Sequence, residues 1–265
     1  MLIFGSGILP VLKKALDLAD AGAAWQILQI AAVLLCMIVP YLFGSVSSSV
    51  LVSRLLFRDD VRRHGSHNAG LTNMYRVYGA KGALPTLVGD ILKAVLSVYF
   101  GGFLIGLGFT SGFSLGYGGY IAAVACVIGH IWPVFYGFKG GKGVLCSAVS
   151  VGLLCPWVLL VLFVVFVGVF LLTRYVSLSS CAAAGLFPVF VPPLMQTVLF
   201  VEIEGVEIVG VPLHITLFSF AIAFLVIYCH RTNIKRLWNG QESKFSFRRS
   251  SAVTPKKEDS EGVEQ

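Results

Sequence analysis

The chain alternates between long apolar stretches and short polar or glycine-rich segments. Seven apolar stretches can be delimited, at about 25–52, 83–106, 119–138, 144–155, 156–173, 175–200 and 211–229. A helix crosses a bilayer in about 20 residues, and helices satisfy all of their backbone hydrogen bonds within lipid. The pattern therefore predicts an all-α polytopic membrane protein, built as a bundle of seven transmembrane helices.

The region 144–173 admits two interpretations, one tilted helix or two helices. A turn at Gly152, Cys155 and Pro156 gives two, although the first of them is short for a crossing. If 144–173 forms two helices, the basic loop 54–81 and the basic segment 231–249 lie on the same side of the membrane, and the acidic loop 202–207 lies on the other side. Because cytoplasmic loops collect Lys and Arg, we expect the N-terminus outside and the C-terminus in the cytoplasm.

Three regions follow from the same pattern. Residues 1–22 form an N-terminal extension, predicted as a short surface helix around Lys13 and Lys14. Residues 23–245 form the membrane domain. Residues 246–265 are polar, carry no apolar period and are predicted to be disordered.

Composition excludes several classes of protein. Mean hydropathy is +0.85, and 57% of residues are hydrophobic against 12% charged, which is too much apolar surface for a soluble fold of this size. The net charge of +7 is explained by the cytoplasmic helix ends, and no basic soluble domain supports a nucleic-acid partner. The six cysteines show no C-x-x-C or Cys/His metal spacing, so we expect buried thiols and neither a metal nor another cofactor.

A first polar motif, 64–76, lies beside the membrane. It combines neutral hydrogen-bonding side chains with a guanidinium, at Ser66, Asn68, Thr72, Asn73 and Arg76. Arginine grips phosphate with several donors, and hydroxyls and amides supplement it. A solvated loop with ordinary helix caps is the alternative interpretation.

A second motif, 129–143, ends in a glycine–lysine segment between two apolar stretches. It contains Lys139, Gly140, Gly141, Lys142 and Gly143. Successive backbone N–H groups before a helix can form an anion-binding nest. The segment is not a nucleotide-binding P-loop, whose spacing demands Gly at 136 and Ser or Thr at 143. The alternative is a glycine hinge with lysines that reach towards the membrane surface.

Two further motifs start or end apolar stretches. Ser177 and Ser179 belong to a hydroxyl cluster before one span, and His230 and Asn233 are three apart, on one helix face, after the last. Their alternatives are a helix cap and a basic interfacial anchor. The predicted topology places all four motifs at the cytoplasmic face, which favours a shared phosphate site.

Asp90 and Lys93 are also three apart, but lie within a span. Ionisable groups there are costly and often functional. We interpret them as a structural pair that seals the bundle.

Together the motifs resemble the bacterial acyl-phosphate-dependent glycerol-3-phosphate acyltransferase family, the PlsY type. The resemblance covers about 30–245 and includes G-H-x-x-P-x-F-x-x-F-K-G-G-K-G at 129–143 and H-x-x-N-I-x-R-L-x-x-G-x-E at 230–242. Three places depart from the family pattern. His67 and Leu71 replace Gly and Ala, Ser47 replaces the proline of the first span, and Ala94 replaces the glycine after Lys93.

The resemblance implies transfer of a fatty acyl group from acyl phosphate to the 1-hydroxyl of sn-glycerol 3-phosphate, giving lysophosphatidic acid. It implies a multi-pass protein of the bacterial cell membrane, with its site facing the cytoplasm and no cofactor. Lys142 and the glycine loop are expected to hold a phosphate, that of the donor. Docking of a soluble enzyme that makes acyl phosphate is left open. The implied catalytic residues are Ser66, Arg76, Lys142, His230 and Asn233, and the implied substrate-binding residues are Asn68, Thr72, Asn73, Lys139, Gly140, Gly141, Gly143, Ser177 and Ser179.

Two other classes of function fit the sequence less well. Glycerolipid acyltransferases that use thioesters carry H-x-x-x-x-D, but the residues five positions after the five histidines are Ala69, Thr72, Phe135, Ser219 and Lys235. A transporter of a phosphate-containing or organic anion would also have a helical membrane bundle and anion-binding sites. Against it stand the lack of an evident internal repeat and the clustering of motifs at one face, since transporters bind near the membrane midplane.

Overall fold

The computed structural model describes residues 7–17, 22–105, 117–202, 211 and 213–245. These residues are helical with connecting turns, and they contain no strand. Within these described ranges, five helices are long and apolar enough to cross a membrane, or six if α10 and α11 form one bent span. The predicted all-α membrane class is confirmed. The elements are α2 (Leu9–Ala15), α3 (Ala23–Ser45), α4 (Ser48–Phe57), η1 (Val61–Arg63), α5 (Leu71–Leu104), α6 (Gly118–Ile131), η2 (Val134–Tyr136), α7 (Val144–Leu154), α8 (Pro156–Thr173), α9 (Val176–Glu202), α10 (Leu213–Cys229) and α11 (Arg231–Trp238).

The break predicted near Gly152–Pro156 is confirmed. α7 ends at Leu154 and α8 begins at Pro156, since proline lacks an N–H and is favoured at the first helical position. α7 has 11 residues and is therefore about 16 Å long, against about 30 Å of hydrocarbon. Helix length alone accordingly supports five or six crossings, and the seventh stays a prediction. The predicted disordered tail, 246–265, lies outside the described residues, as do Glu204 and Glu207 of the acidic loop.

α5 begins much earlier than the apolar pattern predicted. The pattern placed a charged loop up to residue 81, whereas the helix starts at Leu71 and carries Arg76 and Lys81, with a non-helical Gly79 between them. Hydropathy marks only the part of a helix that lies in lipid, so it missed the polar turns that continue beyond the membrane. The first polar motif therefore ends on a helix rather than in a loop.

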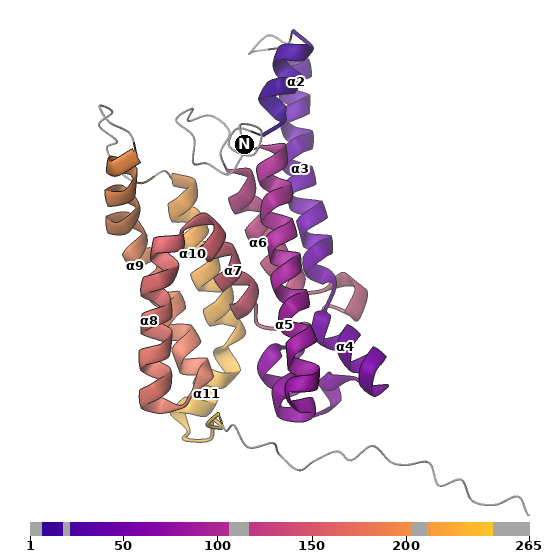
Figure 1. Cartoon of the computed structure of the whole chain (residues 1–265), viewed down its shortest axis with the longest axis vertical. Coiled ribbons are helices and arrows are strands. Elements are labelled where there is room, and N and C mark those ends of the chain that lie inside the picture. The colour runs from indigo at the N-terminus through magenta and orange to yellow at the C-terminus, as the bar shows by residue number, and fades with distance from the viewer. Residues whose placement is uncertain (1–6, 18–21, 106–116, 203–210, 212, 246–265) are drawn as a thin grey trace, which may run out of the picture.

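The helices form two groups that meet around α7 (Figure 1). In one group α3 and α5 both pack on α6, and in the other α9 packs between α8 and α10. α7 contacts α5, α6 and α8, and α10 contacts α6. α2 and α11 lie at opposite ends of the bundle.

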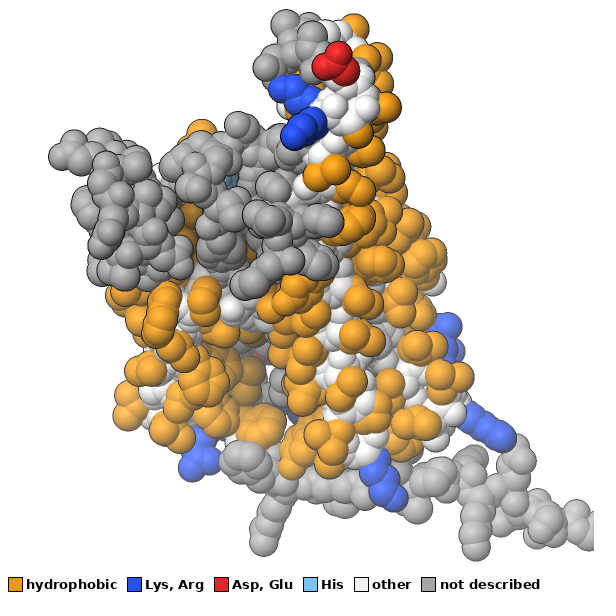
Figure 2. Space-filling view, turned by 45° about the horizontal axis from the view of Figure 1, so that its top comes forward, with side chains coloured by type: hydrophobic (Ala, Val, Ile, Leu, Met, Phe, Trp, Pro, Cys, Tyr) orange, Lys and Arg blue, Asp and Glu red, His pale blue; other side chains and the backbone are white. Residues whose placement is uncertain are grey.

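The outer surface is suited to lipid. Figure 2 shows a broad belt of hydrophobic side chains, with Lys and Arg side chains beyond its lower edge. Leucines on the long helices point outwards, and Leu172 is 87% exposed. Such exposure would be unfavourable in water but is neutral against lipid tails.

α5 and α6 approach each other closely at a pair of glycines. A Cβ atom on Gly101 would overlap the backbone carbonyl of Gly118, and a Cβ on Gly118 would overlap that of Gly101. Small residues let membrane helices pack backbone to backbone. The contact therefore requires glycine on both helices.

Ser47, at the departure from the family's proline, retains a backbone that suits proline. Its φ is −76°, within the range of the proline ring, and Val46 before it is extended, with φ −72° and ψ 97°. We expect Ser47→Pro to fold and to gain about 0.4–1 kcal/mol of stability, because proline restricts the unfolded chain. Thermal unfolding in detergent measures the gain.

Ser47→Ala is the control, because Ser47 Oγ lies 3.3 Å from Ser49 Oγ and proline loses that contact too. A Ser47→Pro variant that melts below Ser47→Ala would contradict this account.

Candidate active site

A cavity of about 440 Å³ opens where the two helix groups meet. All five residues expected to be catalytic line it, namely Ser66, Arg76, Lys142, His230 and Asn233. They come from the loop before α5, from α5, from the loop before α7, and from the junction of α10 and α11. The fold thus gathers three motifs that lie far apart in the sequence.

The expected substrate-binding residues divide into two sets. Asn68, Thr72, Asn73, Gly143 and Ser177 line the same cavity, and Gly141 lines an adjoining hollow beside Lys142.

Lys139, Gly140 and Ser179 line neither space, contrary to expectation. Lys139 is exposed, and the buried Ser179 hydroxyl donates to Tyr175 O of its own helix at 2.9 Å. Lys139 and Gly140 lie in a loop, where no regular period shows which side chains turn inwards. Ser177 and Ser179 are two residues apart on α9 and therefore do not face the same side.

Asn73 organises the loop before α5. Its Oδ1 accepts from the Ser66 N–H at 2.8 Å, and its Nδ2 lies 3.0–3.2 Å from the carbonyl oxygens of Val61, His64 and Asn68. With both ends of the amide engaged, its part in the site is to shape the loop that carries Ser66.

His67 has a positive φ of 58°, a conformation in which glycine is strain-free. Its Nδ1 lies 3.1 Å from Arg62 O. The departure from the family's glycine thus leaves the left-handed turn intact.

Two loops, 61–70 and 132–143, are joined directly. Arg62 Nη1 donates to Tyr136 O at 2.8 Å, and the Ala69 N–H donates to Gly140 O at 3.4 Å. Arg62 also pairs with Asp60 at 2.7 Å, and this bond holds the pKa of the Asp60 carboxyl well below its usual value. The first two motifs therefore form one connected unit.

The glycine–lysine segment provides fewer free N–H groups than a nest would. The Gly140 N–H donates to Ile131 O at 3.1 Å and the Gly141 N–H donates to His130 O at 3.0 Å, so the prediction was wrong for these two donors. What faces the cavity instead is the start of α7, through Gly143, Val144 and Leu145. The first N–H groups of a helix lack intrahelical partners and attract anions.

Lys142 is held by a chain of polar contacts. Its Nζ donates to Asn233 Oδ1 at 2.5 Å, and Asn233 Nδ2 donates to Glu242 Oε1 at 2.6 Å. The same carboxylate accepts from Ser177 Oγ and from Arg236 Nε, both at 2.8 Å. Because an ammonium has three N–H groups, Lys142 keeps donors for a ligand.

The charges of this chain are set by their surroundings. Burial lowers the pKa of Lys142 to about 8, although the nearby Glu242 works in the opposite direction. Burial also opposes ionisation of Glu242, but hydrogen bonds from Arg236, Asn233 and Ser177 outweigh it, so its pKa lies below the usual value. Near neutral pH the cavity therefore contains a cationic Lys142 tied to an anionic Glu242.

His230 lines the cavity and has one ring nitrogen that can accept a hydrogen bond. Its Nδ1 lies 2.8 Å from Val226 O, and because a carbonyl only accepts, the proton resides on Nδ1 and leaves Nε2 with a lone pair. Burial and the charge of Lys142 lower the pKa of His230 to about 4. The ring is thus neutral and suited to accept from a hydroxyl.

Ser180, Arg236 and Glu242 also line the cavity, although the implied site residues did not include them. Arg236 and Glu242 are fixed positions of the 230–242 motif, and Glu242 is the one acidic residue in the basic segment 230–250. Such an isolated carboxylate among cations indicates an ion pair.

Beyond the polar end, the cavity wall is apolar. Its lining follows one face of α7 and continues on α8, α9 and α10, with the residues Leu145, Ala148, Val151, Leu159, Leu162, Phe163, Phe166, Ala183, Ala184, Phe187, Ile222 and Val226. Such a wall suits a hydrocarbon chain.

Comparisons with known proteins identify the family of this chain. Residues 34–240 match the family model described as glycerol-3-phosphate acyltransferase. The glycerol-3-phosphate acyltransferase of Syntrophomonas wolfei is 38% identical over 210 residues, which cover 79% of this chain and 95% of the relative. That of Finegoldia magna is 38% identical over 213 residues, covering 78% and 93%.

The crystal structure of PlsY, an integral membrane glycerol 3-phosphate acyltransferase, in its glycerol 3-phosphate form is similar, with a TM-score of 0.62 and 34% identity. The match covers 81% of this chain and 96% of that one. The lysophosphatidic acid form of PlsY gives a TM-score of 0.60. By sequence and by fold, this chain belongs to the glycerol-3-phosphate acyltransferase family.

Proposed function

We propose that this membrane acyltransferase moves a fatty acyl group from acyl phosphate to the 1-hydroxyl of sn-glycerol 3-phosphate, releasing lysophosphatidic acid and phosphate. Family membership supports an acyltransferase acting on glycerol 3-phosphate, and favours it over the anion transporter. The identity of the acyl donor rests on the composition of the cavity.

The observation that carries the proposal is a single cavity with a cationic, polar end and an apolar remainder. Lys142, Arg76 and Arg236 surround its polar end, and apolar side chains of α7–α10 line the rest. An acyl phosphate has the same two parts, a charged head and a hydrocarbon chain. Arginine and lysine donors suit two phosphate groups held together.

The chemistry requires alignment more than activation. An acyl phosphate is a mixed anhydride with a good leaving group, so the acceptor hydroxyl can attack the carbonyl carbon directly. The new ester C–O bond forms as the bond to phosphate breaks, and the hydroxyl proton leaves with the phosphate. Holding both reactants in register supplies the main rate gain.

In this proposal the cavity residues have different tasks. Lys142 and the start of α7 hold the donor phosphate. Ser66, Thr72 and Arg76 frame glycerol phosphate, and Asn233 orients Lys142. His230 Nε2 would repel a phosphate oxygen, since both are acceptors, so its partner is the glycerol hydroxyl. This task needs neutral His230, which its pKa of about 4 provides.

A product assay with purified protein in detergent tests the proposal. Labelled glycerol 3-phosphate is supplied with palmitoyl phosphate or with palmitoyl thioesters. We expect labelled lysophosphatidic acid from the acyl phosphate alone. Product from thioesters at an equal rate would overturn the donor, and no product from any donor would overturn the enzyme.

The pH dependence should report the buried lysine. Because Lys142 has a pKa of about 8 and binds phosphate as a cation, kcat/KM should be flat near pH 7 and fall up to about tenfold per unit above pH 8. Glycerol phosphate stays dianionic in this range, since its second pKa is about 6. Initial rates are measured with spontaneous hydrolysis of the donor subtracted.

Lys142→Arg is the matched variant, because a guanidinium stays charged throughout this range. Its residual activity should lack the alkaline fall. The same alkaline fall in both proteins would assign the titration to another group.

We also propose a bacterial plasma-membrane location, with seven crossings, the N-terminus outside and the site facing the cytoplasm. The opposite positions of α2 and α11 and the basic residues at the site's end support an odd number of crossings. The exposed Arg63, Arg231 and Lys235 at that end offer a surface for a soluble enzyme that makes acyl phosphate.

A further inference from the structure

Asp90, Lys93 and His130 form a buried polar cluster directly behind the glycine–lysine segment. Lys93 Nζ lies 2.7 Å from Asp90 Oδ1, 2.9 Å from His130 Nδ1 and 3.2 Å from Val46 O. All three side chains are at most 7% exposed, and both Asp90 and His130 reach the cavity wall. The expected Asp90–Lys93 pair therefore exists, and it includes a histidine that the motif spacing did not connect to it.

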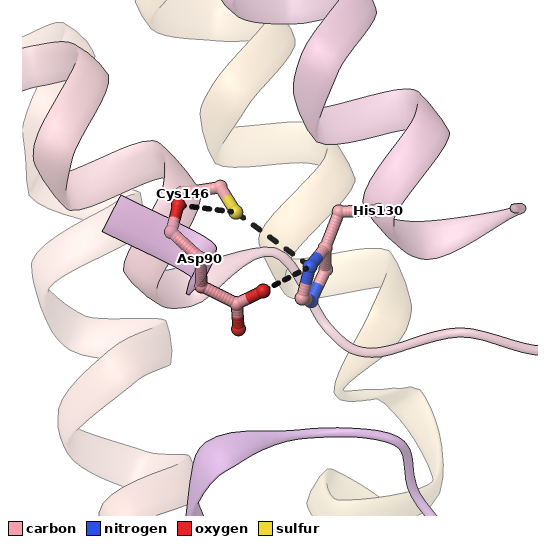
Figure 3. Close-up of side chains that lie close together, drawn as sticks. All are labelled: Asp90, His130 and Cys146. Carbon is pink, nitrogen blue, oxygen red and sulfur yellow. Dashed lines mark hydrogen bonds and ion pairs between the residues drawn. The ribbon is translucent and has the colours of Figure 1, made fainter. Parts of the chain in front are cut away.

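The contacts determine which nitrogen of His130 carries the proton. Figure 3 shows Asp90 and Cys146 on the same side of the ring, with dashed lines to the same nitrogen. That nitrogen, Nδ1, is 3.7 Å from Asp90 Oδ1 and 3.6 Å from Cys146 Sγ. The closest group is the Lys93 ammonium, which can only donate. Nδ1 is thus an acceptor, and the proton is on Nε2.

The other side of the ring supports the glycine–lysine segment. A Cβ atom on Gly141 would overlap His130 Nε2, so the imidazole occupies the space that a side chain at 141 would need. The backbone of His130 and Ile131 also binds Gly141 and Gly140. Lys142, the next residue, is therefore placed by His130 through both its ring and its backbone.

A metal ion is the competing explanation for this cluster. Within the described residues, Asp90, His130 and Cys146 have ligand atoms within 4.8 Å of one another. Lys93 already supplies a positive charge between Asp90 and His130, however. A metal ion there would be repelled by the ammonium at short range.

We propose that Asp90, Lys93 and His130 are positioning residues of the transferase: Lys93 fixes His130 as the Nε2–H tautomer, and the ring holds the glycine–lysine segment so that Lys142 points into the cavity. The kinetic consequence rests on the proposed function. The tautomer of His130 does not rest on it. The positioning role and the proposed function can therefore fail independently.

The first test is spectroscopic. Nitrogen NMR of protein labelled with ¹⁵N-histidine distinguishes the two tautomers, and the resonances missing in His130→Asn assign the ring. We expect His130 to carry its proton on Nε2, with that state lost in the Asp90→Asn/Lys93→Met double variant. A proton on Nδ1 in the native protein, or stoichiometric zinc by elemental analysis, would overturn the proposal even in an enzyme that uses acyl phosphate.

The second test separates positioning from stability. His130→Asn keeps an acceptor for Lys93 but empties the space behind Gly141. We expect KM for acyl phosphate to rise about a hundredfold, since small displacements of binding groups have costs of that order, while His130→Gln, which fills the space, recovers at least tenfold of the loss. Thr86→Val is the control, because Thr86 is buried on α5, the helix of Asp90 and Lys93, and its hydroxyl donates to Gly82 O of that helix.

A purely structural cluster predicts a different result. Destabilised variants would lose active molecules and hence apparent kcat, with KM unchanged in His130→Asn as in Thr86→Val. That outcome would overturn the positioning role. Lack of acyl transfer in the native protein, with the tautomer as expected, would count against the proposed function instead.

Discussion

Replacing Lys142 with alanine is expected to lower kcat/KM for acyl transfer by about 10²–10³-fold, the usual cost of removing a preorganised donor from a reaction site. The ammonium is half-buried at the start of α7 and keeps donors beyond its bond to Asn233. The other two cationic side chains that line the described cavity are engaged elsewhere in our proposal, since Arg236 is bound to Glu242 and Arg76 frames glycerol phosphate, so neither replaces the lost charge. Steady-state rates with palmitoyl phosphate measure the loss.

Lys139→Ala is the matched control, since it removes the same charge three residues away on an exposed side chain. We expect it to change kcat/KM less than threefold, about the effect of one screened surface charge. Equal losses in both variants would mean that the segment binds through its net charge, and the assignment of Lys142 to the cavity would fail.

Replacing Gly101 with alanine should destabilise the protein by about 1–3 kcal/mol, the usual cost of overpacking a core. The added Cβ meets the backbone of Gly118, which cannot move aside as a flexible side chain could. α5 and α6 would have to separate, and α6 carries His130 at its other end. Thermal unfolding in detergent measures the loss.

Gly168→Ala provides the comparison, because a Cβ there meets nothing within 4 Å. Alanine is the better helix former, so this variant should melt no lower than the native protein. If both substitutions lowered the melting temperature alike, helix geometry rather than the close contact would be responsible.

The apolar pattern anticipated the helices well where lipid determines them. α9 and α10 lie close to their expected ranges, and Pro156 marked the break after α7 because proline acts locally. Where water surrounds the chain the pattern failed, since a polar helix turn and a polar loop have similar composition. The start of α5 at Leu71, well before the expected residue 83, is the clearest case.

The site was predictable in residue types but only partly in geometry. Charge, hydroxyl groups and helical spacing marked the motifs that contain Ser66, Arg76, Lys142, His230 and Asn233, and the family resemblance selected these five as catalytic. The fold brings all of them to one cavity. No local rule distinguishes Lys139 from Lys142, because the backbone turns between them. The task of Asn73 depends on carbonyl oxygens of its own loop, and their positions arise only in the folded chain.

Glu242 gives the site an order of assembly. It follows the last apolar helix, yet its carboxylate joins Ser177 at the start of α9 to Asn233 and Arg236 of α11. During synthesis Ser66, Arg76 and Lys142 emerge long before it, so a growing chain holds most of the cavity without the group that closes it. Lys142 can be fixed only once α10 and α11 have followed α9 out of the ribosome, and a chain released before residue 242 would contain the helices but not the completed site.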